Sequence, residues 1–288
     1  MNFPYEDHFI VTNGVTLHVV QAGPLDGPVA LLLHGFPDFW ASWTAQVDHL
    51  VQAGYRVWIP DQRGYNESEK PPDIDSYHIN ILADDVCGLI SSTGNQKVTL
   101  LGHDWGGAVS WWLAHRNPDL IDRLIIINSA HFSVILHYMK WNLRQLARSW
   151  YMYFFRIPFL PEYLLRRRNY QALTEALTKR SQPNTFSATD LDRCRAAWSQ
   201  PGALKSMINW YRALMRDKPV TTKSVQITVP TLLIWGSQDH ALGQEMAQPS
   251  IDLCDQGELR MISNAGHWVH REASSTVNRY ILEFLSKK

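Results

Sequence analysis

The chain has 288 residues, of which 45% are hydrophobic and 19% are charged. This balance supplies enough apolar material for a packed core and excludes a disordered chain. The 27 basic and 27 acidic residues give a formal net charge of +0. The chain therefore lacks the basic excess that nucleic-acid binding by bulk electrostatics requires.

The cysteines and the length of the apolar runs indicate the compartment in which the protein works. Cys87, Cys194 and Cys254 are widely spaced and form no C-x-x-C motif, which favours a reducing compartment over a disulfide framework or a cysteine-based zinc site. The first residues lack the features of a signal peptide, and no apolar run approaches the roughly 18 residues that span a bilayer. We expect a cytoplasmic protein without stable membrane insertion, and a homodimer is compatible with the sequence.

Short β-rich runs alternate with helical patterns through the first 130 residues. We expect strands at 15–21, 29–33, 55–59, 98–101 and 124–127, and helices near 42–53, 78–93 and 106–116. The continuous apolar run at 29–33 is typical of a strand buried on both faces. Strands that alternate with helices predict a mainly parallel α/β sheet, in which ligands bind beyond the carboxyl ends of the strands.

The pattern changes after residue 130. From 131 to 222, apolar and aromatic residues recur at helical spacing, and prolines divide the segment into short helices. Strand patterns return at 229–235 and 258–262, and a last helix is expected near 272–286. The sequence thus predicts one α/β core, formed by residues 1–130 and 223–288, with a helical cap of residues 131–222 inserted in it.

The segment Gly102-His103-Asp104-Trp105-Gly106 lies between an apolar strand and a helical pattern. It has the frame of the nucleophile elbow G-x-S-x-G, with aspartate where serine would stand. Glycines on both sides of so sharp a turn let backbones approach around the strained central residue. A helix N-terminus also favours a carboxylate. Asp104 is therefore the candidate nucleophile.

Three further features could complete a catalytic site: an oxyanion hole, an acid and a histidine. The backbone N–H groups of Phe36 and Trp105 could form an oxyanion hole. Asp239 follows a late strand, and His267 lies near the C-terminus. Taken alone, Asp239 could cap a helix and His267 could be a core histidine. Their order in the chain, nucleophile then acid then histidine, is the order of α/β-hydrolases, and the combination favours a catalytic triad.

At these motifs the chain resembles the α/β-hydrolase superfamily and, within it, the epoxide hydrolases. Residues 34–40, His-Gly-Phe-Pro-Asp-Phe-Trp, are similar to that family's H-G-F-P-[ED]-x-W block, and residues 61–68 are similar to its D-x-R-G-Y-G-x-S block. The resemblance implies an α/β-hydrolase fold with a helical cap (lid). One departure is Asn66, where the family has glycine; asparagine tolerates left-handed backbone angles, so we expect the turn to survive.

The nucleophile selects the reaction. A carboxylate that attacks an acyl carbon would form a reactive anhydride, whereas attack on an sp³ carbon forms a stable ester. Asp104 is ionised at neutral pH, and His267, oriented by Asp239, can activate the water that hydrolyses this ester. A haloalkane-type dehalogenase would need two N–H donors that bind the departing halide. Trp105 could be the first, but Phe36 stands in the position of the second and has no donor in its side chain. An epoxide needs acids that protonate its oxygen.

The resemblance implies that tyrosines of the cap supply these acids. Residues 151–158 are similar to the family's Y-x-x-x-F-Q-x-P segment, and residues 209–212 are similar to its N-W-Y-R segment. These matches assign Tyr151 and Tyr211, with Tyr153 as the main rival of Tyr151. As substrate-binding residues we expect Phe36, Pro37, Trp105 and Tyr153.

No nucleotide-binding motif occurs, and the spacing of His267 and His270 lacks the carboxylate of a metal site. We therefore expect no cofactor and no metal. The predicted activity is hydrolysis of a small lipophilic epoxide to a vicinal diol through a covalent aspartyl ester. The alternatives are a dehalogenase with the same Asp-His-Asp triad and a catalytically silent ligand-binding protein on the same fold.

Overall fold

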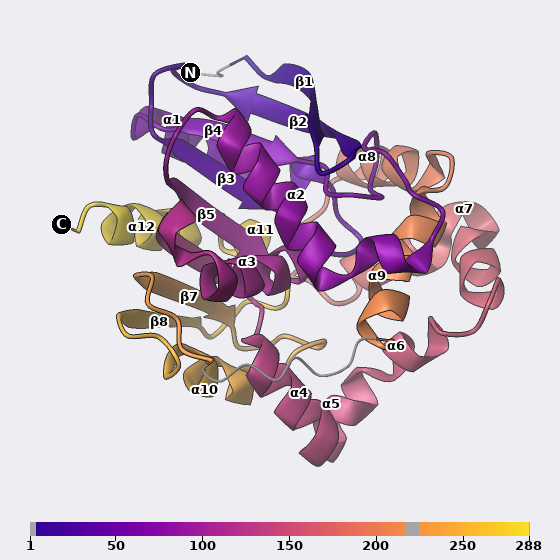
Figure 1. The fold of residues 1–288 in the computed structure, drawn as a ribbon. Coiled ribbons are helices and arrows are strands. Elements are labelled where there is room, and N and C mark those ends of the chain that lie inside the picture. The colour runs from indigo at the N-terminus through magenta and orange to yellow at the C-terminus, as the bar shows by residue number, and fades with distance from the viewer. Residues whose placement is uncertain (1–3, 217–224, 288) are drawn as a thin grey trace.

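A single mixed sheet forms the centre of the molecule. The computed structural model describes residues 4–216 and 225–287. Its strands are β1 (Glu6–Thr12), β2 (Val15–Ala22), β3 (Val29–Leu33), β4 (Arg56–Pro60), β5 (Val98–His103), β6 (Ile121–Ile127), β7 (Thr231–Gly236) and β8 (Gly257–Ile262). They are ordered β1-β2-β4-β3-β5-β6-β7-β8 (Figure 1). The strand β2 runs antiparallel to both of its neighbours, β1 and β4, and all other neighbouring strands are parallel. The prediction of a mainly parallel sheet is therefore confirmed.

Helices cover both faces of this sheet. They are α1 (Thr44–Gln52), α2 (Ile79–Ser92), α3 (Trp105–Arg116), α10 (Ala247–Ile251), α11 (Val269–Glu272) and α12 (Ser274–Leu285). Leu32 of β3 belongs to a buried cluster with α1 and α12, and Leu31 belongs to the cluster that contains α2 and α3. Successive strand residues point to opposite faces, so the continuous apolar run of β3 is buried on both, as predicted.

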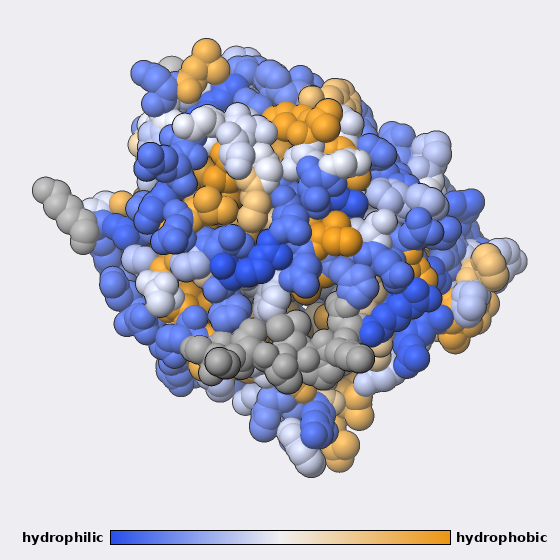
Figure 2. Space-filling view, viewed as in Figure 1, coloured by the Kyte–Doolittle hydropathy of each residue, from blue (hydrophilic) through white to orange (hydrophobic). Residues whose placement is uncertain are grey.

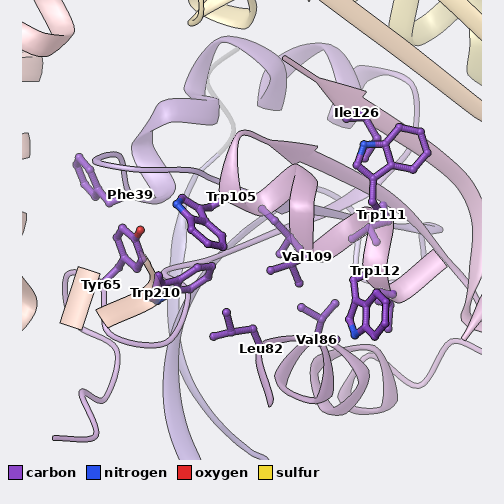
Figure 3. Packing of buried hydrophobic residues seen from close by; sticks show 14 of the residues in the cluster. Phe39, Tyr65, Leu82, Val86, Trp105, Val109, Trp111, Trp112, Ile126 and Trp210 are labelled. Carbon is purple, nitrogen blue, oxygen red and sulfur yellow. The ribbon is translucent and has the colours of Figure 1, made fainter. Parts of the chain in front are cut away.

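The cluster beneath α3 also fixes the start of that helix. Trp105 and Val109 of α3 pack near Leu82 and Val86 of α2 (Figure 3), and all four are at least 92% buried. Burial of each aliphatic side chain contributes roughly 1.5–3 kcal/mol relative to exposure. The helix that follows the turn at Asp104 is therefore held by the buried core.

A group of helices lies between β6 and β7 in the chain, at one side of the sheet (Figure 1). We call these the inserted helices: α4 (Phe132–Trp141), α5 (Leu143–Arg148), α6 (Trp150–Phe154), α7 (Leu160–Thr178), α8 (Ala188–Ser199) and α9 (Ala203–Leu214). His131, where the cap was predicted to begin, caps α4 by accepting the Ser133 N–H. The predicted end of the cap, at residue 222, lies outside the described residues.

Two local features differ from the sequence prediction. The strand β1 was not predicted, because it is an edge strand whose residues are mostly exposed and show no apolar alternation. In α7 the backbone leaves helical geometry at residues 167–170. The expectation at Asn66 is met: its φ is 39°, and its amide donates to Asp61 Oδ2 at 2.7 Å.

Candidate active site

Asp104 stands alone at the turn between β5 and α3. Its backbone has φ 50° and ψ −117°, a strained conformation for a residue with a side chain. Two glycines make room for it. A Cβ atom on Gly35 would lie 2.4 Å from Asp104 Cβ, and one on Gly106 would lie 2.1 Å from the Leu33 carbonyl oxygen. A Cβ atom on Gly102 would lie 2.5 Å from the Gly106 carbonyl oxygen, so both glycines of the motif recognised in the sequence are required by close backbone approach.

Hydrogen bonds fix the orientation of this carboxylate. Phe36 donates its backbone N–H to Asp104 Oδ1 at 2.8 Å, and the Ser129 hydroxyl donates to the Asp104 carbonyl oxygen at 2.8 Å. Burial raises the pKa of Asp104, but the His267 ring and the Phe36 N–H outweigh it and hold the pKa below its usual value. Asp104 is therefore ionised at neutral pH, and its Oδ1 is engaged by the Phe36 N–H.

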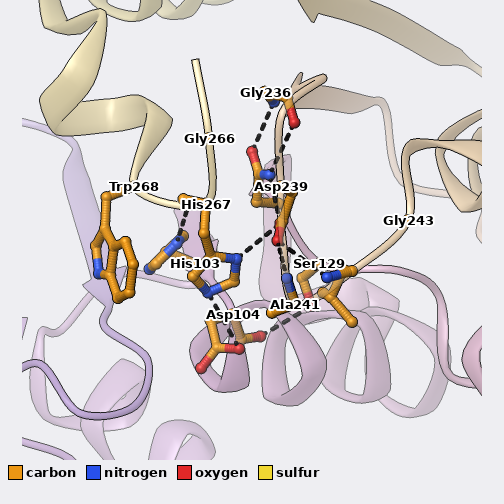
Figure 4. A network of polar contacts seen from close by, with 12 residues as sticks. His103, Asp104, Ser129, Gly236, Asp239, Ala241, Gly243, Gly266, His267 and Trp268 are labelled. Atoms are coloured by element: carbon orange, nitrogen blue, oxygen red, sulfur yellow. Dashed lines mark hydrogen bonds and ion pairs between the residues drawn. The ribbon is translucent and has the colours of Figure 1, made fainter. Parts of the chain in front are cut away.

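The three predicted triad residues meet in space (Figure 4). His267 Nε2 lies 3.5 Å from Asp104 Oδ2, and its Nδ1 lies 2.7 Å from Asp239 Oδ2. Asp239 is fixed in turn by the backbone N–H groups of Ala241 and Leu242, which donate to Oδ1 at 2.7 and 2.9 Å. The imidazole thus lies between the buried carboxylate of Asp239 and the partly exposed carboxylate of Asp104, which come from separate loops.

This position controls the charge of the histidine. Burial lowers the pKa of His267, but Asp239 and Asp104 oppose it and raise the pKa well above its usual value. The same pairing outweighs burial at Asp239, whose pKa is lowered. At neutral pH the site therefore holds a protonated imidazole between two carboxylates, and the imidazole loses one of its two stabilising charges if Asp104 becomes neutral.

Two tyrosines of the inserted helices share one cavity with Asp104. Tyr151 of α6 and Tyr211 of α9 have ring centroids 5.7 Å apart at an interplanar angle of 79°, and Tyr211 also packs edge-on against Trp105 at 5.1 Å. Burial raises the pKa of both tyrosines above the usual value, and the negative charge of Asp104 adds to this effect. Both therefore keep their hydroxyl protons at neutral pH.

The cavity has a volume of about 210 Å³ and is mostly apolar. Its walls include Asp104 and Trp105 on the core side and both tyrosines on the other. From Asp104 it extends along α4, which contributes one helical stripe formed by Phe132, Ile135, Leu136 and Met139. Such a lining suits a lipophilic ligand with few polar groups.

Three of the four residues predicted to bind substrate are not among the residues that line the cavity. Tyr153 is 42% exposed and does not line the cavity. It follows Tyr151 by two positions on α6 and thus points to the other side of the helix, so the structure does not bring it together with Asp104. The ring of Phe36 packs on Tyr211 at 5.2 Å, and the Pro37 carbonyl accepts the Trp198 indole N–H at 2.6 Å. Neither Phe36 nor Pro37 is among the cavity-lining residues.

Sequence reasoning missed two polar residues of the site. Asn128 directly follows β6 and donates its amide to Asp239 Oδ2 at 2.7 Å, while its Oδ1 accepts the Gly236 N–H at 2.8 Å. Asp38 is fully buried and accepts the Trp268 indole N–H at 2.8 Å. A polar residue at the end of an apolar strand was the available signal for Asn128. Within residues 4–216 and 225–287, no group of three His, Cys, Asp or Glu residues is placed to hold a metal ion.

Comparisons with known proteins agree with this geometry. The family described as "alpha/beta hydrolase fold" matches residues 28–274. The chain is 44% identical to the AB hydrolase superfamily protein YfhM of Bacillus subtilis, over 97% of this chain and 98% of that one. It is 37% identical to mouse epoxide hydrolase 4, over 97% of this chain and 79% of that one. The crystal structure of an epoxide hydrolase from Bacillus megaterium in complex with an inhibitor superposes with a TM-score of 0.88 at 28% identity, covering 97% of this chain and 100% of that one. The chain therefore belongs to the α/β-hydrolase superfamily and, within it, to the epoxide hydrolase family.

Proposed function

We propose that this enzyme converts lipophilic epoxides to vicinal diols through a covalent ester on Asp104. The observation that carries the proposal is the shared cavity, which is lined both by the carboxylate of Asp104 and by two protonated tyrosines. Residues 131–222 act in this proposal as the cap that brings the tyrosines over the nucleophile. A cytoplasmic location remains part of the proposal.

In the first step Asp104 Oδ2, the oxygen that the Phe36 N–H does not hold, attacks a ring carbon of the epoxide. A carbon–oxygen bond to Asp104 forms, and the ring carbon–oxygen bond breaks with its electron pair moving to the ring oxygen. Tyr151 or Tyr211 gives its hydroxyl proton to that oxygen as charge develops. Because Asp104 Oδ1 is already held by the Phe36 N–H, it becomes the carbonyl oxygen of the ester.

Formation of the ester lowers the pKa of His267. Asp104 is now neutral, so one of the two charges that raise the pKa of His267 is gone. His267 releases its proton, which restores the tyrosine, and the neutral ring then takes a proton from a water molecule. Hydroxide attacks the ester carbonyl carbon, and the Phe36 N–H stabilises the oxyanion. As this intermediate collapses, the bond between the carbonyl carbon and the diol oxygen breaks, and that oxygen takes the proton of the added hydroxyl, so the diol leaves. The carboxylate of Asp104 is regenerated with one oxygen from water.

The haloalkane-type dehalogenase is the weaker candidate. Halide release requires N–H donors placed around the leaving group, and the residue after His34-Gly35 is Phe36, whose side chain has none. Two tyrosine hydroxyls in the cavity fit protonation of an oxygen instead.

The test is diol formation from a panel of aryl, alkyl and fatty-acid epoxides. The wild type should turn over at least one class, and Asp104→Asn should abolish the activity. Asp119→Asn, at an exposed aspartate without an ion pair to any described residue, is the matched control and should behave as the wild type. Release of free halide from haloalkanes without diol formation, or tight ligand binding without turnover in a folded sample, would overturn the proposal.

A further inference from the structure

An exposed apolar face lies on the inserted helices. The described residues expose sixteen large apolar side chains, and eleven of them fall between residues 136 and 164. Phe159 is 85% exposed, Leu143 is 82% exposed and Trp141 is 68% exposed. We define the exposed apolar face as Leu136, Trp141, Leu143, Leu146, Trp150, Tyr153, Ile157, Phe159, Leu160, Tyr163 and Leu164. Figure 2, viewed as in Figure 1, shows orange residues interspersed with blue ones along the edge where α7 lies.

The same stretch carries an excess of positive charge. Residues 132–170 contain one acidic residue, Glu162, and seven basic residues. Glu162 is already paired with Arg212 at 2.6 Å. None of the seven basic residues forms an ion pair with any described residue; they are Lys140, Arg144, Arg148, Arg156, Arg166, Arg167 and Arg168. Because the whole chain is neutral, this face is a local cationic region.

The exposed apolar face is continuous with the cavity. Leu136 of α4 is 44% exposed and also lines the cavity beside Ile135 and Met139. A lipophilic molecule that leaves a surface covering this face would therefore meet the apolar wall of the cavity at once. Scattered exposed apolar side chains need no explanation, but a face that adjoins the cavity can pass a lipophilic substrate into it.

We propose that this face docks the enzyme reversibly on an anionic lipid bilayer. Tryptophan, tyrosine, phenylalanine and leucine beside arginine and lysine form the composition that lies in the interface of a membrane. Each basic side chain near an anionic surface is attracted to it. No helix of the described residues is long and apolar enough to cross a membrane, so docking is peripheral.

A second copy of the chain is the weaker occupant. In a two-fold symmetric dimer the same patch faces itself, which would bring the unpaired basic side chains of both copies together. Like charges placed across an interface oppose association, whereas an anionic bilayer neutralises them. The charge of the face therefore selects the lipid surface.

The experiment is flotation of the full chain with vesicles. We expect binding to phosphatidylglycerol–phosphatidylcholine vesicles, loss of binding in high salt, and little binding to phosphatidylcholine alone. Leu143→Ser with Phe159→Ser should weaken binding by about tenfold or more. The matched control, Phe9→Ser with Leu25→Ser, changes two exposed side chains elsewhere and should bind as the wild type.

A charge pair separates electrostatic attraction from apolar contact. Arg144→Glu with Arg166→Glu should reduce binding by about tenfold or more, whereas Lys97→Glu with Lys205→Glu should not. Turnover of a water-soluble epoxide serves as the folding control and should be unchanged in all four variants. Flotation measures binding without turnover, so its result can be interpreted even if the proposed reaction is wrong.

Three outcomes would overturn the proposal. The wild type could fail to float with anionic vesicles. It could bind neutral and anionic vesicles equally, which would remove the role of the basic residues. Sedimentation could show a dimer that Leu143→Ser with Phe159→Ser dissociates, which would assign the face to a second copy.

Discussion

Asp104 adopts a backbone conformation that aspartate seldom takes, and such strain costs of order 1–3 kcal/mol. The contacts of Gly35, Gly106 and the Phe36 N–H hold it in place. Gly106 belongs to the local motif around Asp104, so the sharp turn could be predicted from neighbouring residues. The contact between Gly35 and Asp104 joins positions far apart in the chain, so no local pattern predicts it.

The proposed acids can be tested one at a time. Tyr151→Phe and Tyr211→Phe each remove one hydroxyl from the cavity, and we expect each to slow ring opening by about 100-fold. The measurement is the single-turnover rate of ester formation with excess enzyme. Tyr153→Phe is the matched control, because Tyr153 lies on the same helix but is exposed outside the cavity. Equal rates for all three variants and the wild type would remove the tyrosines from the mechanism.

Asp38 should make stability depend on pH. Burial raises the pKa of this carboxyl to about 6, above its unfolded value of about 3.9. The folded state therefore binds the proton more tightly, and the resulting stability is present at low pH and is lost as the pH rises through 6. An asparagine at this position cannot ionise, so Asp38→Asn should gain about 2 kcal/mol relative to the wild type between about pH 4.5 and pH 8.

Urea unfolding at the two pH values measures this difference. Asp119→Asn, on the surface, should show no such change with pH. A gain for Asp38→Asn that is the same at both pH values would indicate that packing, and not ionisation, separates the two proteins.

At the scale of elements, the strands position the site. Asp104 follows β5, Asn128 follows β6 and Asp239 follows β7, and these strands are neighbours in the sheet. Parallel strands end at the same edge, so residues far apart in the chain meet there. This arrangement gives Asn128 the role of a positioning residue, because it joins the loops after β6 and β7 through Asp239 and Gly236.

Asn128→Asp tests that role with little change of shape. The variant keeps an acceptor for the Gly236 N–H but places a second carboxylate beside Asp239. The added charge should raise the pKa of His267 further, so the pH at which ester hydrolysis reaches half its maximum should increase by about one unit. The pH profile of the single-turnover hydrolysis rate measures this shift. Asn95→Asp, at an exposed loop, is the control; an unchanged profile in Asn128→Asp would assign Asn128 a purely structural part.

Elements with strong local patterns were predicted within a few residues. The buried strands β3, β5 and β7 and the helix α3 follow from continuous apolar runs and from the elbow motif. The edge strand β1 and the break in α7 could not be predicted in the same way. Pairing with β2 stabilises β1, and a partner strand leaves no mark in the residues of β1 itself.

At the scale of the whole molecule, the inserted helices are attached to the core at the loops that carry the site. Gln145 of α5 donates to the Ala241 carbonyl oxygen at 2.9 Å and accepts the Gly243 N–H at 3.0 Å. Trp198 of α8 donates to the Pro37 carbonyl oxygen. These bonds hold the tyrosines in register with Asp104. They join residues about 100 or more positions apart, so no local pattern predicts them.

The central claim is that the oxygen added to the substrate comes from Asp104 and not directly from water. A single turnover with excess enzyme, carried out in water labelled with a heavy oxygen isotope, tests it most directly. We expect the first diol to carry no label and the peptide that contains Asp104 to gain it, as mass spectrometry of both would show. A labelled diol with an unlabelled Asp104 peptide in that first turnover would mean that water opens the ring itself, and the covalent mechanism would be wrong.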